Sequence, residues 1–213
     1  MARTTDSGTA STIAADGSRT RLTAVRLTVS GLVLFTIFLL IAAQASALQP
    51  RSFRKGTSTS APSGAGVLCR TYAWACSVSS HASSVSTADL AVVDKVNRAI
   101  NRSVRFLADR RQFRVEESWS LPTERGGDCE DFVLLKKREL IGRGFPAQAL
   151  LIATALDRQR RGHAVLIVRT HAGDLVLDNV TDGVKKWSDT GYIFLRMQNP
   201  ASPNRWINVV SAN

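Results

Sequence analysis

A single cysteine stands in the most unusual stretch of this chain, Gly126–Phe132, which reads Gly-Gly-Asp-Cys-Glu-Asp-Phe. Two residues that could work with a thiol follow it: His163 in a Gly-His-Ala-Val segment and Asp178 in a Leu-Asp-Asn segment. A thiolate attacks carbonyl carbon, an imidazole takes and returns the proton, and a carboxylate orients the imidazole. These residue types in this order predict a thiol hydrolase, with Cys129 as nucleophile, His163 as base and Asp178 as the residue that orients it.

Cys129 stands where a predicted helix begins, and that helix runs to about Arg143. The unpaired N–H groups and the dipole of a helix N-terminus stabilise negative charge, which lowers the pKa of a thiol placed there. Gly126 and Gly127 precede it and allow a tight turn and the close approach of a substrate backbone. The local pattern therefore favours an activated thiol.

Three acidic neighbours, Asp128, Glu130 and Asp131, oppose this activation. Nearby negative charges raise the pKa of a thiol, because they disfavour a further negative charge. Hydrogen bonds from the helix N–H groups, or a cation held by the acids, would remove the conflict. Alternatively, the acids serve only the first turn of the helix, where carboxylates are favourable.

A predicted β-hairpin would bring the histidine and the aspartate together. Its strands are His163–Thr170 and Leu175–Asn179, joined by turn residues 171–174. This register pairs Asp178 within a residue or two of His163, and directly opposed side chains have Cβ atoms about 4.5–5.5 Å apart. Each residue alone has an ordinary explanation, since a lone cysteine is usually a small buried side chain. Their combination with the glycines, the helix start and the hairpin favours a functional site.

The remaining periodicity predicts further helices and strands. A helix from an N-cap at Thr87 to about Leu107 carries apolar residues at three- and four-residue steps. The dense apolar run Ala149–Ala155 predicts a buried strand, and Tyr192–Met197 predicts another. The lysines and arginines of the helix that begins at Cys129 are expected to belong to a solvated basic surface.

The first 47 residues have the three parts of a secretory signal. A cluster of arginines precedes the uncharged run Leu27–Ala43, and Ala45–Ala47 has the small-residue pattern of a cleavage site. We therefore expect a signal peptide at 1–47, which places the rest of the chain outside the cytoplasm; an uncleaved anchor is the alternative, since a membrane span needs about 17–25 apolar residues. Residues 48–66, rich in Ser, Thr, Gly and Pro, are predicted to be a flexible linker, and 67–213 the folded domain.

Charge and cysteine content narrow the function further. A net charge of +11 could suit nucleic acid or an anionic membrane. The basic residues are spread widely, however, without the aromatic-rich basic motif of a nucleic-acid module, so we expect no nucleic-acid partner. Of the three cysteines, Cys69 and Cys76 are expected to form a local disulfide in an exported protein; two buried free thiols are the alternative.

The motifs resemble those of a known family. Gly-Asp-Cys-Glu-Asp-Phe at 127–132, Gly-His-Ala-Val-Leu at 162–166 and Leu-Asp-Asn at 177–179 are similar to the bacterial transglutaminase-like cysteine proteinases. The resemblance extends from about residue 68 to residue 208, with Phe132 where a tyrosine is usual. It implies an α+β fold with a papain/transglutaminase-like core, in which the nucleophile helix packs on an antiparallel sheet that carries the histidine and the aspartate.

The resemblance also implies residue roles. Cys129, His163 and Asp178 match the catalytic positions of the family. Some members bind calcium beside the cysteine, and the ligands implied here are Asp128, Glu130, Asp131 and Asn179. Trp119 resembles the aromatic residue upstream of the nucleophile and is expected to form a wall of the cleft.

For substrate and partners, the resemblance implies a periplasmic cysteine endopeptidase that cleaves a large surface adhesin, with an inner-membrane receptor as regulator in some relatives. Two alternatives remain open from the residues. The same triad could transfer the acyl group to an amine, as in a transglutaminase or amidase, because water and an amine compete for one acyl-enzyme. The fold could also serve as a non-catalytic module that binds calcium or a peptide.

Overall fold

The computed structural model describes residues 52–78 and 83–210. The predicted signal peptide at 1–47 lies outside the described residues. Among the residues that the structure describes, no helix combines the length and the apolar character that a membrane span requires.

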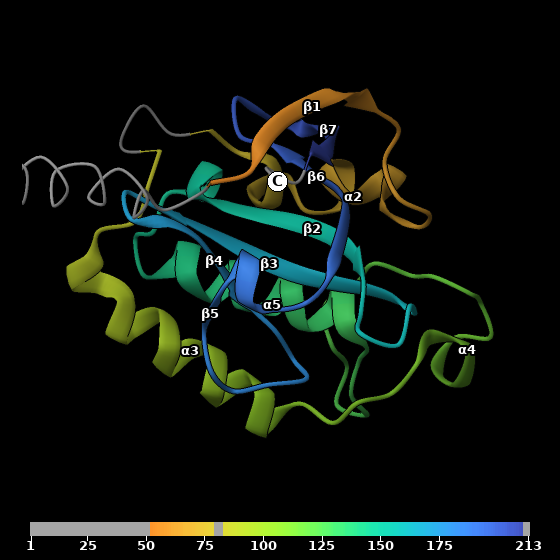
Figure 1. Cartoon of the computed structure of the whole chain (residues 1–213). Helices are drawn as coiled ribbons and strands as arrows, with labels where there is room; N and C mark the ends of the chain where they lie inside the picture. Colours follow the sequence, from red (N-terminus) through yellow and green to blue (C-terminus); the bar gives the residue numbers. More distant parts are fainter. Residues whose placement is uncertain (1–51, 79–82, 211–213) are drawn as a thin grey trace, which may run out of the picture. The chain divides into compact units, whose positions relative to one another are not determined.

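A seven-stranded antiparallel sheet with the order β1-β7-β6-β2-β3-β4-β5 forms the centre of the fold (Figure 1). Its strands are β1 (Arg54–Thr59), β2 (Leu150–Leu156), β3 (Gly162–Thr170), β4 (Gly173–Leu177), β5 (Lys185–Lys186), β6 (Ile193–Asn199) and β7 (Ser202–Val210). β2 and β3 lie side by side near the middle and pair over their whole length, from Leu150 opposite Val168 to Leu156 opposite Gly162. Every described neighbouring pair runs antiparallel, and short connections join β2 to β3, β3 to β4 and β6 to β7.

The helices come mostly before the sheet in the chain. They are α2 (Leu68–Thr71), α3 (Leu90–Ser103), α4 (Asp109–Gln112) and α5 (Cys129–Gly142), with 3-10 turns η2 (Ala65–Val67), η3 (Ala73–Cys76), η4 (Thr87–Asp89), η5 (Ala147–Ala149) and η6 (Trp187–Asp189). α5 packs along β3 and β2 on one face of the sheet, and α3 packs on α5 (Figure 1). The order of helices and antiparallel strands is that of an α+β fold, as the sequence predicts.

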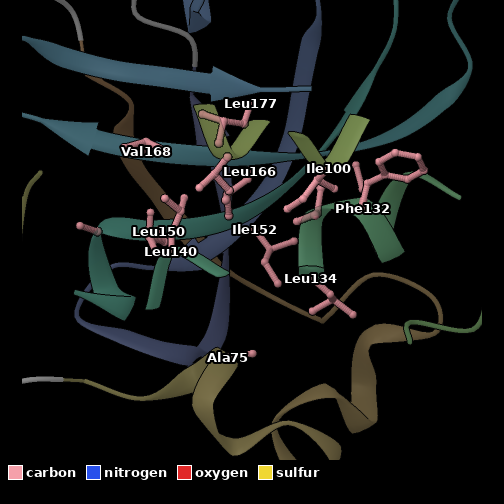
Figure 2. Close-up of a cluster of buried hydrophobic side chains, with 14 of the residues drawn as sticks. Ala75, Ile100, Phe132, Leu134, Leu140, Leu150, Ile152, Leu166, Val168 and Leu177 are labelled. Atoms are coloured by element: carbon pink, nitrogen blue, oxygen red, sulfur yellow. The ribbon is translucent and has the colours of Figure 1, made fainter. Parts of the chain in front are cut away.

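β2 and β3 are apolar at successive positions because both faces of the sheet are covered. On one face, Ile152 and Leu166 meet Leu134 of α5 and Ile100 of α3 in the main core (Figure 2). On the other face, a second core contains the alternate residues of the same strands, such as Ile167. This double burial fixes the register, since a slip of one residue would exchange the two faces.

The first strand corrects the predicted linker. Residues 54–59, expected to lie in a flexible segment, form β1 and pair with β7 at the edge of the sheet. Just before β1, Phe53 is buried in the second core against Trp187 and Phe194, with ring centroids 4.5 and 4.8 Å away. Pairing with β7 and the burial of Phe53 hold this polar segment in the sheet. Its sequence therefore lacks the alternation of apolar residues from which a strand could be predicted.

Helix α3 carries the predicted apolar stripe but is shorter than expected. Val93, Val96 and Ile100 are buried in the main core. The side chain that caps the preceding turn η4 belongs to Ser86, which accepts from the N–H of Ala88, and Thr87 is the first residue of that turn. Val104 at the C-terminal end is extended, so the helix ends at Ser103.

Helix α5 contradicts the prediction of a solvated basic surface over its middle. Lys136 and Lys137 are fully buried, because the sheet covers one side of the helix and α3 the other. Burial lowers the pKa of each lysine to about 7. Lys137 Nζ donates to Gln198 Oε1 at 2.7 Å, which satisfies one of the two ammonium groups inside the domain.

A disulfide joins Cys69 of α2 to Cys76 of η3, with Cα atoms 5.6 Å apart. This is the pairing expected from the sequence. The loop that it closes is tied to the sheet through Gln198, whose Nε2 donates to the carbonyl oxygens of Ala75 and Pro203. Cys129 is the free cysteine of the described residues.

Candidate active site

Cys129 is the first residue of α5, at the end of a constrained approach. Gly126 has φ +130°, and a Cβ there would lie 2.1 Å from the carbonyl oxygen of Arg105, so this position requires glycine. At Gly127 a Cβ would lie 2.5 Å from Oδ2 of Asp131. The backbone of Gly127 is also paired with the segment at Arg105 and Leu107. The two glycines thus fix how the chain delivers Cys129 to the helix start.

His163 and Asp178 are joined by a hydrogen bond of 2.9 Å between Nε2 and Oδ1. The hairpin of β3 and β4 brings them together: its ladder ends at Leu166 opposite Leu177, and Asp178 is the next residue. His163 stands at the start of β3, where its side chain is 8% exposed. The predicted hairpin register therefore places the imidazole and the carboxylate in contact.

Asp178 is held as a carboxylate. Burial alone would raise its pKa, but the hydrogen bonds from His163, Tyr192 and the N–H of Val180 outweigh burial, and the pKa lies below its ordinary value. Tyr192 Oη donates to Oδ2 at 2.5 Å, and Val180 N–H donates to Oδ1 at 2.9 Å. An ionised Asp178 accepts from His163 Nε2–H, which leaves Nδ1 of the imidazole free to accept a proton.

The loop after Asp178 is anchored to α3. Nδ2 of Asn101 donates to the carbonyl oxygens of Asp178 and Thr181, at 2.9 and 3.3 Å. Asn97, one turn earlier, donates to the carbonyl oxygen of Asp182 at 2.9 Å. The helix that carries the core stripe therefore also fixes the backbone of the aspartate.

The thiol of Cys129 lies in a cleft of about 190 Å³ that His163 also lines. Trp119 forms part of the same cleft, as the resemblance implied. The thiol donates to Oε2 of Glu130 at 3.2 Å. Burial, followed by the negative charge of Glu130, raises the pKa of Cys129 well above its ordinary value, and a hydrogen bond from the backbone of Ala164 opposes them.

Three carboxylates crowd beside the thiol. Asp109, Asp128 and Glu130 each offer an oxygen atom within 4.8 Å of the others. Each also has one buried oxygen that receives no hydrogen bond from the described residues. Burial, followed by the charge of Asp128, raises the pKa of Glu130 to about 9. Buried carboxylate oxygens without donors are the kind of ligand that a calcium ion takes, so these residues fit that cation.

The structure separates the implied calcium ligands. Asp128 and Glu130 lie in the carboxylate cluster, together with Asp109 of α4. Asp131 lies outside it: Oδ1 accepts from the backbone N–H of Ser120 at 3.1 Å, which fastens the upstream loop to α5. Asn179 lines the same groove as the cluster and has a buried Oδ1 without a donor among the described residues.

The acids do not cap the helix in the ordinary way. Asp128 is the N-cap residue of α5, yet its side chain makes no capping hydrogen bond. Its Oδ2 accepts instead from the backbone N–H of Asp109 at 3.0 Å. The alternative that these carboxylates only serve the helix start therefore does not describe Asp128.

The chain also matches a known protein family. The bacterial transglutaminase-like cysteine proteinase family (BTLCP) matches residues 55–213. The chain belongs to this family. The match begins within β1, in agreement with a folded domain that includes the first strand.

Solved structures of LapG from Legionella pneumophila are similar to this BTLCP chain. The EGTA-treated form is 24% identical over 50% of this chain and 61% of that chain, with a TM-score of 0.43. A second LapG structure is 28% identical over 50% of this chain and 62% of that chain, with a TM-score of 0.44. The calcium-bound form is 24% identical over 57% and 71%, with a TM-score of 0.47. In the first two comparisons this chain spans about three fifths of LapG. No curated protein matches the chain.

Two residues of this BTLCP site were not found from the sequence. Asp109 comes 19 residues before Asp128 in the chain, and it reaches the cluster because α4 folds against the start of α5. Tyr192 precedes β6 and reaches Asp178 across the sheet. Neither residue stands in a motif, and only the tertiary fold gives them neighbours that reveal a role.

Proposed function

We propose that this chain is an exported cysteine endopeptidase with Cys129 as nucleophile, His163 as general base and Asp178 as the orienting carboxylate. One observation carries the proposal: Cys129 and His163 line a single cleft, and His163 is bonded through Nε2 to an ionised Asp178. This leaves Nδ1 as the nitrogen that takes a proton from the thiol. Membership of the BTLCP family supports the same reaction class.

In the proposed reaction, His163 Nδ1 removes the proton from Sγ, and Sγ forms a bond to the carbonyl carbon of a peptide. The imidazolium then gives its proton to the leaving amine as the C–N bond breaks, and a thioester remains on Cys129. His163 next removes a proton from water, whose oxygen displaces the thiol and releases the acid. Asp178 keeps the imidazole in the required tautomer and stabilises its positive charge.

The negative charge that develops on the carbonyl oxygen of the tetrahedral intermediate needs hydrogen-bond donors. The backbone N–H groups of the first turn of α5, which begins at Cys129, have no partners within the helix. Groups of this kind stabilise an oxyanion without reorganisation. The same helix start thus supplies the nucleophile and the donors.

We further propose calcium as the natural ion of the carboxylate cluster. Asp109, Asp128 and Glu130 would hold it, with Asn179 as a further oxygen ligand. When bound there, the ion supplies positive charge that offsets the carboxylates which raise the pKa of the thiol. A calcium-bound form of LapG has been solved, and that form supports testing this ion first.

The substrate class that we propose is a protein of the periplasm or cell surface, in the first place a large adhesin. Support comes from the family resemblance and from the signal-like pattern of residues 1–47, which would export the chain. A regulatory receptor in the inner membrane is a further proposal on the same basis.

The experiment that tests the function compares the purified protein with Cys129→Ala and His163→Ala. Each is incubated with cell-surface extract in calcium and, separately, in chelator, and products are identified by mass spectrometry. We expect new peptide termini with the unaltered protein in calcium and at least about a 10³-fold lower rate with either variant. His171→Ala is the matched control, because His171 is an exposed histidine bonded to Ser84 in a different part of the domain.

Each outcome assigns the reaction. New termini that depend on Cys129 support the endopeptidase. Linked or amine-modified proteins without cleavage would instead support acyl transfer. A folded protein that leaves every extract protein unchanged, with and without calcium, would refute catalysis and favour the binding module.

A further inference from the structure

A groove of about 590 Å³ is lined by Cys129, His163 and the carboxylate cluster. Phe106 and Val180, from segments far apart in the chain, line the same groove. The groove therefore joins the proposed catalytic atoms to two apolar side chains.

These two side chains are unusually exposed for their type. Val180 is 67% exposed and Phe106 is 63% exposed, the highest values among the large hydrophobic residues of the described chain. Exposed apolar area costs free energy that burial would recover. Single exposed hydrophobic residues are common, but two that line one groove together with the thiol point to a binding surface.

Both side chains are held in place by the catalytic motifs themselves. Phe106 forms a β-bridge to Gly127, and the adjacent Leu107 N–H donates to the carbonyl oxygen of Gly127 at 2.9 Å. The N–H of Val180 donates to Oδ1 of Asp178 at 2.9 Å. Their positions relative to the nucleophile and the histidine are thus fixed by the backbone, as a specificity-determining surface requires.

We propose that Phe106 and Val180 form an apolar subsite for one aliphatic or aromatic side chain of an extended peptide, close to the scissile bond. This inference rests on the proposed endopeptidase and names part of its specificity. Six carboxylates and two arginines line the same groove, so negative charge stays in excess there with one calcium ion bound, and this excess disfavours an acidic side chain. The occupant is therefore apolar rather than acidic.

The test uses a library of peptides prepared from a digested proteome, because such a library samples both sides of the cut. The protein is incubated with it in calcium, and new termini absent with Cys129→Ala are sequenced by mass spectrometry. We expect apolar residues to be enriched over Ser, Thr, Asn and Gln at one position near the cut by about 10-fold, the usual discrimination of a hydrophobic pocket. Val180→Thr, which keeps the shape but adds a hydroxyl, and Phe106→Ala should each reduce that enrichment severalfold.

Val67→Thr is the matched control, since Val67 is 47% exposed and lies outside the groove. It should leave the cleavage profile unchanged. Cleavage that depends on Cys129 but shows no apolar preference, or a preference unaltered in both groove variants, overturns the subsite and leaves the endopeptidase intact. The absence of any Cys129-dependent cleavage overturns the proposed function and the subsite with it. Thermal unfolding of each variant shows which profile changes come from a folded protein.

Discussion

The two halves of the proposed site differ in how their polar atoms are satisfied. In the histidine half, Asp178 accepts hydrogen bonds from His163, Tyr192 and the backbone of Val180. In the thiol half, which comprises Cys129 and its carboxylate cluster, each of the three acids keeps a buried oxygen without a donor among the described residues. Both oxygens of the Asp178 carboxylate therefore have donors within the chain, and one oxygen of each acid in the cluster does not.

Burial acts in the same direction on the carboxylates of both halves, but their pKa values shift in opposite directions. It is the largest influence on Asp178 and on Glu130, and it raises the pKa of both. Three donors reverse that effect at Asp178, so its pKa is lowered. At Glu130 a second carboxylate adds to burial, and the pKa rises to about 9. The difference shows that donors, rather than depth, decide which carboxylate stays charged.

The two halves therefore differ in whether they need a bound ligand. The histidine half is preorganised by the β3–β4 hairpin and α3, so it needs no ligand to orient the imidazole. The thiol half gathers negative charge around a thiol that must itself become negative. Under the proposal above, a cation held by the cluster would offset that charge, and the activity of the thiol would then depend on the cation.

Removing the negative charge of Asp178 should cause the largest loss of catalytic rate. Asp178→Asn keeps the shape but can no longer accept all three donors as an anion, so we expect kcat to fall by about 10⁴-fold, as in other triads. Tyr192→Phe removes one donor and keeps the carboxylate, so its loss should be much smaller. Steady-state kinetics on a peptide found in the cleavage experiment measure both. Equal losses in the two variants would contradict the role of the Asp178 charge.

Removing Asp109, a proposed calcium ligand of the thiol half, should have a smaller effect, and that effect should depend on calcium. The pKa of Cys129 is raised, so alkylation by iodoacetamide should be slow at neutral pH and increase as pH rises. Calcium should shift that profile to lower pH, and Asp109→Asn should lower calcium affinity by about 10- to 100-fold, so the shift should need a correspondingly higher calcium concentration. The exposed Asp189→Asn is the control. A profile that is identical in calcium and chelator would argue against the cation site.

The residues that we propose as catalytic could be picked out from the sequence because their setting is local. Cys129 follows two glycines at a helix start, and the spacing of His163 and Asp178 fits one short hairpin. Patterns of this kind can be recognised in the sequence without knowledge of contacts between distant segments. The same reasoning predicted the apolar stripe of α3 and the buried character of β2.

The features that the sequence did not disclose depend on contacts between distant segments. Asp109 and Tyr192 acquire their roles only when α4 and β6 fold against the site. β1 forms by pairing with β7, although its own residues are polar. Lys136 and Lys137 look like surface residues until α3 and the sheet enclose α5 from both sides. Charge alone is therefore a poor guide to exposure in a helix between two layers.

Lys136 of α5 is a buried lysine whose charge interacts with those of Asp178 and Asp182, so it borders the histidine half. Its buried Nζ has no hydrogen-bond partner among the described residues and lies 5.8 Å from the centre of the Phe132 ring. Burial lowers its pKa to about 7, although the negative charges of Asp178 and Asp182 act to raise it. The unfolded chain keeps the ordinary pKa of 10.5, so between pH 7 and 10.5 the unfolded state binds a proton that the folded state lacks. Stability from this group should therefore rise with pH across that window and be lowest below it.

Lys136→Met tests this last point and should have the smallest effect on catalysis. The variant removes a buried charge, so at pH 6 we expect its free energy of unfolding to exceed that of the unaltered protein by about 1–4 kcal/mol. The gap should close as pH rises to about 10.5 and above, because the lysine of the unaltered protein is then neutral in the folded state and loses its proton in the unfolded state as well. Denaturant unfolding at several pH values measures the gap, and the exposed Lys95→Met should show none. A gap that stays constant with pH would mean that Lys136 is charged to the same degree in both states, and that the histidine half contains a partner for it.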